Sequence, residues 1–472
     1  MTRLGDSVQR ASQLLTQDLS SDETVERLLA ETGSRRRLDL SDLPAKEQAA
    51  LVGARAVDVL PGVDKLAEEI EAKRAQGKGL HVKLGIDPTS ADVHLGHAVP
   101  IIVLSRFQRM GHDVTLIIGD FTAKIGDPSG RTAERPALTD EDIAKNLSGY
   151  QDQVRPFFDF ERVSFRHNSD WLGRIGFAQL ITLLAQVPAS ALLQRDDFRN
   201  RLAQGSGLTM SELIYPVAMA MDSVELDCDI ELGGVDQLLN MQMGRRVMEL
   251  HDQRPQMVAS MPLIEGTDGS GAKMSKSKDN YIGLTADADD VFGKIMSIPD
   301  RLTVPYLRAW TEWTDPEIDR ATARVEAKSL HPMDLKKILA GEVVTALHGA
   351  DAAKAARAGF TAQFSRKTFG DLEALPSVDA GVHGGEGIAA ILTRVLEFTP
   401  SASAARRIAK QNGLRLVVET AGGSGEQRSI VLPEADALRP LAEVVPEKLA
   451  EAGVSGTVYL KAGRRVAQID GL

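Results

Sequence analysis

One stretch near residue 80 restricts the possible folds of this chain more than any other. Residues 80–87, LHVKLGID, alternate apolar and polar side chains, as a half-buried strand does. A proline-containing turn follows, and residues 94–112 then carry apolar side chains at helical spacing, with Gly111 placed to end the helix. The next stretch, DVTLIIGDF, has the composition of a second strand. Strand, helix and strand in this order predict a βαβ unit and therefore a parallel sheet.

The same alternation continues along the chain. Residues 211–226 predict a helix, 227–232 a short strand and 234–252 another helix. After about residue 285 the pattern is mainly helical, and 331–349 is a clear case. We therefore predict an α/β fold with a Rossmann-like parallel sheet, followed by a helical domain and a small α+β C-terminal domain.

This pattern divides the chain into five expected segments. They are a helical N-terminal extension (1–75), a Rossmann-like domain (76–285), a helical domain (286–375), a Gly- and Pro-rich linker (376–387) and a C-terminal domain (388–472). The extension contains three consecutive arginines, RRR at 35–37, which we expect to be a solvated surface feature.

Composition excludes several classes of protein. The 472 residues contain no run of the roughly 18 apolar residues that a membrane helix needs, and we expect neither a membrane segment nor a secretory signal. A single cysteine, Cys228, excludes intramolecular disulfides and multi-cysteine zinc sites, and it fits the cytoplasm. The net charge of −11 argues against a purely nucleic-acid-binding protein but allows local basic patches.

The first chemical motif is His-Leu-Gly-His at 94–97, at the start of a predicted helix. Imidazoles three residues apart share one helix face, and a helix N-terminus favours anions. Gly96 lets a flat base or a ribose approach the backbone. Isolated histidine pairs are usually surface features, but this placement after a strand and a turn favours a site for a nucleoside triphosphate.

The second motif is KMSKS at 273–277, which follows a glycine-rich stretch at 266–271. Two lysines three residues apart on a flexible loop can close on pyrophosphate as it leaves. A lone pair of lysines would more often be a solvated loop. The full pentapeptide favours the functional interpretation.

Together, the two motifs resemble the signatures of class I aminoacyl-tRNA synthetases, which bind ATP and stabilise the adenylation transition state. Five blocks, KLGIDPTSADVHLGH, FTAKIGDPSGR, IYPVAMAMDSVEL, ELGGVDQ and AKMSKSKDNYIGL, resemble consecutive blocks of bacterial tyrosyl-tRNA synthetases. The resemblance covers 75–375 well, the C-terminal part loosely and the first 60 residues hardly at all.

The resemblance implies an activity and its partners. A tyrosine–tRNA ligase joins L-tyrosine to ATP as tyrosyl-adenylate and then transfers the tyrosyl group to the 3′ end of tRNA(Tyr). Mg²⁺ accompanies ATP, and no metal bound by the protein is expected. The family implies a homodimer, and it identifies the helical domain (286–375) as the part that meets the anticodon arm.

The resemblance also assigns roles to individual residues. The expected catalytic residues are His94, His97, Lys273 and Lys276. The residues expected to bind ATP are Asp87, Thr89, Gly96, Gly234, Asp236, Met274, Ser275 and Ser277. The residues expected to bind tyrosine are Lys83, Thr122, Asp127, Tyr215, Met219, Asp222 and Gln237. Asp222 would accept from the tyrosine phenol, and Asp127 would hold its ammonium group. Without the family match, most of these aspartates would be taken for turn formers or helix caps.

Three departures from the family pattern leave the amino acid open. Met219 stands where glutamine is usual near the substrate amine, Val235 where serine or threonine is common, and Lys83 where many members have a tyrosine. Methionine cannot donate a strong hydrogen bond. One alternative is thus a paralogue that activates a different or modified amino acid. A non-catalytic RNA-binding paralogue is a further alternative, against which both intact motifs weigh.

The C-terminal stretch SASAARRIAKQNGLRLV resembles the core of the S4 RNA-binding fold. Arg406, Arg407 and Lys410 would lie on roughly one helix face and bind tRNA, although a solvated face is the alternative. Arg131 and Arg135 follow the IGDPSG turn and could touch the acceptor stem.

Overall fold

The computed structural model describes residues 2–129, 138–193, 195–205, 207–365, 375–410, 413–420, 427–463 and 465–471. Its contacts divide the chain into two compact units, Met1–Ala358 and Gly359–Leu472. Among the described helices, none combines the length and apolar character that crossing a bilayer requires. The predicted boundaries within the first unit remain predictions.

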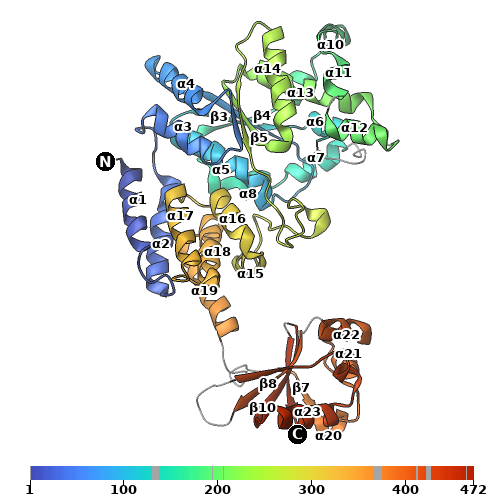
Figure 1. The fold of residues 1–472 in the computed structure, drawn as a ribbon. Helices are drawn as coiled ribbons and strands as arrows, with labels where there is room; N and C mark the ends of the chain where they lie inside the picture. Colours follow the sequence, from blue (N-terminus) through green and yellow to red (C-terminus); the bar gives the residue numbers. More distant parts are fainter. Residues whose placement is uncertain are drawn as a thin grey trace. The chain divides into compact units, whose positions relative to one another are not determined.

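A six-stranded sheet forms the centre of the first unit, in the order β1-β6-β5-β2-β3-β4 (Figure 1). Its strands are β1 (Asp58–Leu60), β2 (His81–Ile86), β3 (Asp113–Ile118), β4 (Val163–His167), β5 (Ile230–Gly234) and β6 (Met257–Met261). All neighbours pair in parallel except β1, which pairs antiparallel with β6. The predicted parallel sheet is confirmed. The extension expected to be helical contributes the short edge strand β1 in addition to its helices.

Strand order reverses between β2 and β5, and this reversal positions the functional site. β2 leads through helix α5 (Leu95–Arg109) to β3 on one side, while β5 leads through α14 (Leu238–Leu250) to β6 on the other. Because such crossovers are right-handed, the two helices cover opposite faces of the sheet. A crevice therefore opens at the carboxyl ends of β2 and β5, where ligands bind in open α/β sheets.

Helix α5 begins and ends as the sequence predicts. The His94 side chain caps it by accepting from Gly96 N at 3.1 Å. At the other end Gly111 adopts φ 86°, a left-handed conformation that favours glycine. The side chains of Ile101, Leu104 and Phe107 are fully buried, so this helix is part of the core.

A connecting segment lies between β3 and β5. Its helices are α6 (Thr122–Ile125), α7 (Asp140–Leu147), α8 (Tyr150–Val154), α9 (Ser169–Leu172), α10 (Phe177–Leu184), α11 (Ala189–Leu193), α12 (Asp196–Ala203) and α13 (Met210–Leu226). Helix α13 starts with a capping box between Thr209 and Glu212, and Glu212 also pairs with buried Arg201 at 2.6 Å. This start aligns Tyr215, Met219 and Asp222 along one helix face.

The rest of the first unit is helical. Its helices are α1 (Arg3–Leu14), α2 (Asp22–Ser34), α3 (Ala45–Gly53), α4 (Val63–Ala75), α15 (Ala288–Ser297), α16 (Thr303–Trp310), α17 (Asp315–Glu326), α18 (Pro332–His348) and α19 (Ala350–Ser365), which crosses into the second unit. In Figure 1 the N-terminal helices α1 and α2 lie beside α17 and α18, which they contact.

The expectation of an exposed arginine triplet is wrong for Arg35. Its guanidinium is fully buried, and its NH2 lies 2.7 Å from Glu317 Oε1 in α17. Arg36 donates to Trp310 O, and Arg37 is exposed. The partner of Arg35 lies 282 positions away in the chain, so local sequence could not reveal it.

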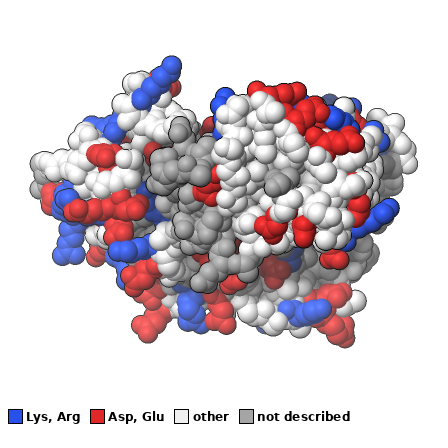
Figure 2. All heavy atoms as spheres, turned by 90° about the horizontal axis from the view of Figure 1, so that it is seen from below, with Lys and Arg blue, Asp and Glu red and all other residues white. Residues whose placement is uncertain are grey.

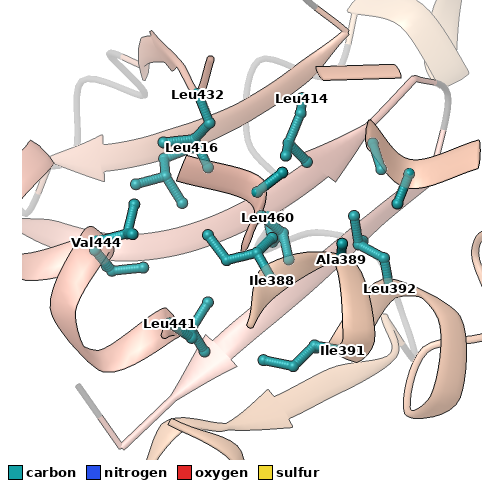
Figure 3. Close-up of a cluster of buried hydrophobic side chains, with 14 of the residues drawn as sticks. Ile388, Ala389, Ile391, Leu392, Leu414, Leu416, Leu432, Leu441, Val444 and Leu460 are labelled. Atoms are coloured by element: carbon teal, nitrogen blue, oxygen red, sulfur yellow. The ribbon is translucent and has the colours of Figure 1, made fainter. Parts of the chain in front are cut away.

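The second unit contains a five-stranded sheet, ordered β7-β11-β10-β8-β9. Its strands are β7 (Ser377–Asp379), β8 (Leu414–Thr420), β9 (Gln427–Val431), β10 (Gly456–Ala462) and β11 (Arg465–Asp470), and its helices are α20 (Ala380–His383), α21 (Ile388–Arg394), α22 (Ala402–Lys410) and α23 (Leu441–Ala452). Figure 3 shows its apolar core, in which Ile388, Leu416 and Leu460 converge from helix and sheet.

The segment 376–387, expected to be a linker, instead carries β7 and α20. Strand β7 pairs in parallel with β11 and buries Val378. Pairing with β11 and the burial of Val378 therefore place a short strand within this glycine-rich stretch.

Candidate active site

A cavity of about 620 Å³ opens at the carboxyl ends of β2 and β5. The predicted site residues that line it are Asp87, Thr89, His94, Gly96, His97, Thr122, Asp127, Tyr215, Met219, Asp222, Gly234, Asp236, Gln237, Lys273, Met274, Ser275 and Lys276. Among the described residues, Lys83 and Val235 do not line the cavity, and the Ser277 side chain lies outside the described part of the structure. The structure therefore brings most of the predicted residues together.

The two histidines stack on each other at the cavity wall. Their ring centroids are 3.7 Å apart, with 18° between the ring planes. Burial, followed by electrostatic interaction with His97, Lys273 and Lys276, lowers the pKa of His94 to about 3. Desolvation by the surrounding protein atoms, followed by the charge of Lys273, lowers the pKa of His97 to about 4, although the residue is exposed. Both imidazoles are neutral at physiological pH.

The helix cap determines which nitrogen of His94 carries the proton. Nδ1 accepts from Gly96 N, so the neutral ring holds its proton on Nε2. A side chain at position 96 would crowd the His94 ring, since a Cβ there would lie 3.1 Å from Nδ1 and 3.6 Å from Met274 Cβ. Gly96 thus allows the cap and the close approach of the lysine-bearing loop.

Backbone hydrogen bonds tie the two motifs together. Leu95 N donates to Ile282 O at 2.8 Å, and Leu284 N donates to Val93 O at 2.9 Å. On the other side of the loop, Met274 N donates to Ile264 O at 2.8 Å. The lysine loop is therefore anchored on one side to the segment that follows β6 and on the other to the start of α5.

Each loop lysine contacts a carboxylate at the cavity wall. Lys273 Nζ lies 2.9 Å from Asp236 Oδ2, and Lys276 pairs with Asp92. Asp236 follows β5 directly, and Gly234 leaves it room because a Cβ there would lie 2.6 Å from Asp236 Oδ1. Both lysines keep much of their surface exposed, so these pairs are weak and exchangeable.

Asp87 anchors a second group of polar side chains at the end of β2. Its Oδ2 accepts from Tyr215 Oη at 2.9 Å, and its Oδ1 accepts from Thr122 Oγ1 at 2.6 Å. A side chain at Gly119 would collide with Asp87, with Cβ only 2.0 Å from Oδ1. Burial and the charge of Asp87 raise the pKa of Tyr215 well above its usual value, so Tyr215 acts as a neutral donor.

Asp222 lies in the deep part of the cavity wall and is only 3% exposed. Trp171 Nε1 donates to its Oδ1 at 2.9 Å, and Asn168 Nδ2 approaches its Oδ2 at 3.4 Å. Burial raises the pKa of Asp222 to about 7, against the lowering effect of Lys83 and these donors. The result is a desolvated acceptor that a ligand hydroxyl can satisfy.

Lys83 lies behind this wall. Its Nζ is 2.8 Å from Glu231 Oε1, and both side chains are 1% exposed. Burial lowers the pKa of Lys83, but the charges of Glu231, Cys228 and Asp222 outweigh that effect and the pKa is raised overall. Lys83 is thus a buried cation of the sheet, while Glu231 contributes to the cavity wall.

Asp127 and Gln237 lie together on another part of the wall. Gln237 Nε2 donates to Asp127 Oδ2 at 2.8 Å, and Ser129 N donates to Asp127 Oδ1 at 3.0 Å. Met219 also lines the cavity, but its thioether offers only a weak acceptor.

Sequence reasoning missed four residues that the structure brings to this site. Two of them had a signal in the sequence. Asn168 is a polar residue directly after strand β4, and Glu231 is a charged residue inside the apolar strand β5. Asp92 precedes the histidine motif. The indole of Trp171 reaches Asp222 across 51 positions, and nothing local indicates that contact.

The predicted tRNA-binding residues lie elsewhere. Arg131 and Arg135 fall outside the described residues. Arg406, Arg407 and Lys410 are all exposed on α22 in the second unit, and Arg406 NH2 lies 2.8 Å from Glu434 Oε1. Within the described residues, no group of three or more His, Cys, Asp or Glu side chains is arranged to hold a metal ion.

Comparisons with known proteins agree with this geometry. The family model described as tRNA synthetases class I (W and Y) matches residues 75–365. The Thermotoga maritima protein named tyrosine–tRNA ligase is 42% identical over 353 residues, covering 75% of this chain and 86% of the relative. The Desulfotalea psychrophila protein of the same name is 38% identical over 398 residues, covering 84% and 96%.

Two solved structures share the fold. A C-terminally truncated mitochondrial tyrosyl-tRNA synthetase from Aspergillus nidulans superposes with TM-score 0.57 at 21% identity, covering 72% of this chain and all of that one. The Archaeoglobus fulgidus tyrosyl-tRNA synthetase, solved with L-tyrosine, gives TM-score 0.54 at 20% identity, covering 66% and 99%. Since the family model spans more than half of the residues and the sequence relatives are covered almost end to end, the chain belongs to the class I tRNA synthetases of the W and Y group.

Proposed function

We propose that this protein is a tyrosine–tRNA ligase, which forms tyrosyl-adenylate from L-tyrosine and ATP and transfers the tyrosyl group to tRNA(Tyr). One observation carries the proposal: two neutral histidines, two loop lysines and a buried carboxylate line the same cavity. Relatives named tyrosine–tRNA ligase, at about 40% identity over most of the chain, support it.

The nucleotide end would work by positioning and electrostatics. The tyrosine carboxylate attacks the α-phosphorus of ATP in line, and pyrophosphate leaves with Mg²⁺, which enters as part of the ATP substrate. The Nε2–H of His94 is a neutral donor toward phosphate oxygens, with its tautomer set by the helix cap. Lys273 and Lys276 would bind the pyrophosphate as it leaves and offset its negative charge. No side chain is needed as nucleophile or base.

The amino-acid end would recognise tyrosine by its two polar ends. Asp222 accepts from the phenol, and Asp127 and Tyr215 lie where they can hold the ammonium group. A buried acceptor left unpaired keeps its desolvation cost. Phenylalanine, which lacks the hydroxyl, is therefore rejected.

Met219 motivates a second candidate, a ligase for a different or modified amino acid. Met219 lines the cavity where the family usually has glutamine. Against this candidate, Asp127 already has Gln237 and Ser129 as partners, so the ammonium site keeps its polar groups without residue 219.

Pyrophosphate exchange with each of the twenty amino acids tests both candidates. We expect exchange with tyrosine only, and its loss in His97→Ala and Lys276→Ala. Lys278→Ala is the matched control, because Lys278 is an exposed lysine of the same loop outside the cavity wall. Preference for another amino acid would overturn the tyrosine assignment. Absence of any adenylate by mass spectrometry would favour the non-catalytic alternative.

Transfer RNA and a second copy of the chain are the proposed macromolecular partners. On the face drawn in Figure 2, basic and acidic side chains are interspersed, so RNA contacts on this face would be confined to a few places. Exposed Arg407 and Lys410 on α22 are candidates for contacting tRNA, and residues 388–472 would form an S4-like RNA-binding domain.

The exposed apolar side chains of helix α10 support a homodimer, because Phe177 and Ile181 are 79% and 51% exposed. Charging of tRNA would place the enzyme in the cytoplasm.

A further inference from the structure

A buried arginine behind the cavity begins a series of hydrogen bonds that reaches its wall. Arg195, the residue before α12, is 6% exposed. Its NH1 donates to Asn240 Oδ1 at 2.6 Å, and its NH2 donates to Ser129 Oγ at 3.0 Å. The guanidinium also lies over the Phe198 ring, 4.9 Å from the centroid. These contacts hold one orientation of the guanidinium.

From Asn240 the series continues to the amino-acid end of the cavity. Asn240 Nδ2 donates to Gln237 Oε1 at 2.8 Å, and Gln237 Nε2 donates to Asp127 Oδ2 at 2.8 Å. Asp127 and Gln237 line the cavity, whereas Arg195 and Asn240 are not among its lining residues. We call Arg195, Asn240, Gln237 and Asp127 the Arg195 network.

The direction of these hydrogen bonds follows from the chemistry of the guanidinium. Arginine can only donate, so Asn240 must turn its oxygen toward Arg195 and its amide nitrogen toward Gln237. Gln237 then accepts with Oε1 and has Nε2 left for Asp127. An amide has nearly the same shape in both orientations. The reversed orientation of Gln237 would place Oε1 against the Asp127 carboxylate, where two acceptors repel each other.

We propose that Arg195 is a positioning residue for the amino-acid half of the site, which sets the direction of both amides and so holds the Asp127 carboxylate ready for an ammonium group. This assignment rests on the proposed function. The ATP half of the site is positioned by other contacts. His94 accepts a hydrogen bond from Gly96 N, Lys273 pairs with Asp236, and Lys276 pairs with Asp92. Loss of the Arg195 network therefore weakens amino-acid binding and leaves ATP binding unchanged.

Three variants separate this role from simple packing. Arg195→Met removes the donor. Arg195→Lys keeps a donor at the same place. Asn240→Asp keeps the volume and pairs with Arg195, but a carboxylate cannot donate to Gln237. Arg199→Met is the matched control, because Arg199 lies four residues further along, is exposed and pairs with exposed Asp196.

We would measure the KM for tyrosine and the KM for ATP by steady-state pyrophosphate exchange on the full-length protein. Circular dichroism checks that each variant folds. We expect the KM for tyrosine to rise about tenfold in Arg195→Met and in Asn240→Asp, the loss of about one well-placed hydrogen bond. Arg195→Lys should recover most of the loss, and the KM for ATP should stay within about twofold in all of them. Asn240→Asp decides the question if Arg195→Met does not fold.

An unchanged tyrosine KM in Asn240→Asp, or an ATP KM that rises as much as the tyrosine KM, overturns the assignment. Wild-type protein is run alongside. If it shows no tyrosine-dependent exchange, the proposed function fails and this role for Arg195 fails with it. If wild type is active and the variants match it, only the role of Arg195 fails.

Discussion

The ammonium of Lys273 lies 2.9 Å from Asp236 Oδ2, so a lysine of the glycine-rich loop contacts a carboxylate that we expect to bind ATP. Ribose hydroxyls entering the cavity would compete with Lys273 for Asp236. Because the Lys273 side chain is 51% exposed, breaking this ion pair costs little free energy. Nucleotide binding would thereby free the lysine for the phosphates.

The first prediction concerns this lysine. Lys273→Ala should lower the rate of tyrosyl-adenylate formation about 10²–10³-fold, because the lysine acts on charge that develops as pyrophosphate leaves. Tyrosine affinity should stay within about twofold. Stopped-flow single-turnover kinetics measure the rate, and Lys278→Ala serves as the control. A tyrosine affinity that falls as much as the rate would contradict a role in the transition state.

Asp222 carries the second prediction. Asp222→Asn replaces an acceptor with a side chain that must place an NH₂ group near either Trp171 Nε1 or Asn168 Nδ2, both of which are donors. We expect kcat/KM for tyrosine to fall about 10–100-fold, and that for phenylalanine to change little. Pyrophosphate exchange with both amino acids gives the ratio. Asp170→Asn, at an exposed position in α9, should leave the ratio unchanged.

A third prediction tests the buried pair between Arg35 and Glu317. Arg35→Met should lower the free energy of unfolding by about 3–5 kcal/mol, because it strands a buried carboxylate. The double variant Arg35→Met, Glu317→Gln should lose less than the sum of the two single variants. Urea denaturation measures these differences. Arg37→Ala, at an exposed position, should change stability by less than about 0.5 kcal/mol; a loss in Arg37→Ala equal to that in Arg35→Met would refute the argument.

His112 gives a fourth prediction, on pH. Its Nδ1 accepts from Leu80 N at 3.1 Å, and burial lowers its pKa from the usual 6.5 to about 4. Between these values the unfolded chain binds more protons than the folded one, so stability is lost as pH falls below 6.5. This one group should contribute a loss of about 2 kcal/mol between pH 7.5 and 5.

The matched variant is His112→Asn, whose oxygen can replace Nδ1 as acceptor. It should start less stable at pH 7.5 because its contact with Gln48 is lost, yet it should lose about 2 kcal/mol less than wild type on going to pH 5. Urea denaturation at both pH values gives the comparison. Equal losses in the two proteins would show that His112 does not titrate in this way.

Much of the fold was predictable from sequence because its signals are local. The alternation of residues 81–86 predicts β2, the helical spacing that begins at 95 predicts α5, and Gly111 ends that helix with a positive φ. Each feature depends on neighbours within a few positions. Since parallel strands end at one edge of a sheet, the polar residues after β2 and β5 meet there.

The contacts that set the burial and charge of the site residues were not predictable from local sequence. Trp171 and Asn168 meet Asp222 across more than fifty positions, and Arg35 meets Glu317 across 282. Lys83 resembled a ligand contact in the sequence, yet it pairs with Glu231 behind the wall. A charged residue is buried only where a partner is present, and local sequence does not show that partner.

By itself, then, the sequence determined the alternation of strand and helix around β2, β3 and β5, the two motifs at strand and helix ends, and the family to which the chain belongs. Tertiary structure alone decided which charges are buried and how Arg195 is connected to Asp127. The physical reason is range: backbone conformation responds to near neighbours, whereas desolvation and hydrogen-bond direction depend on groups that only folding brings together.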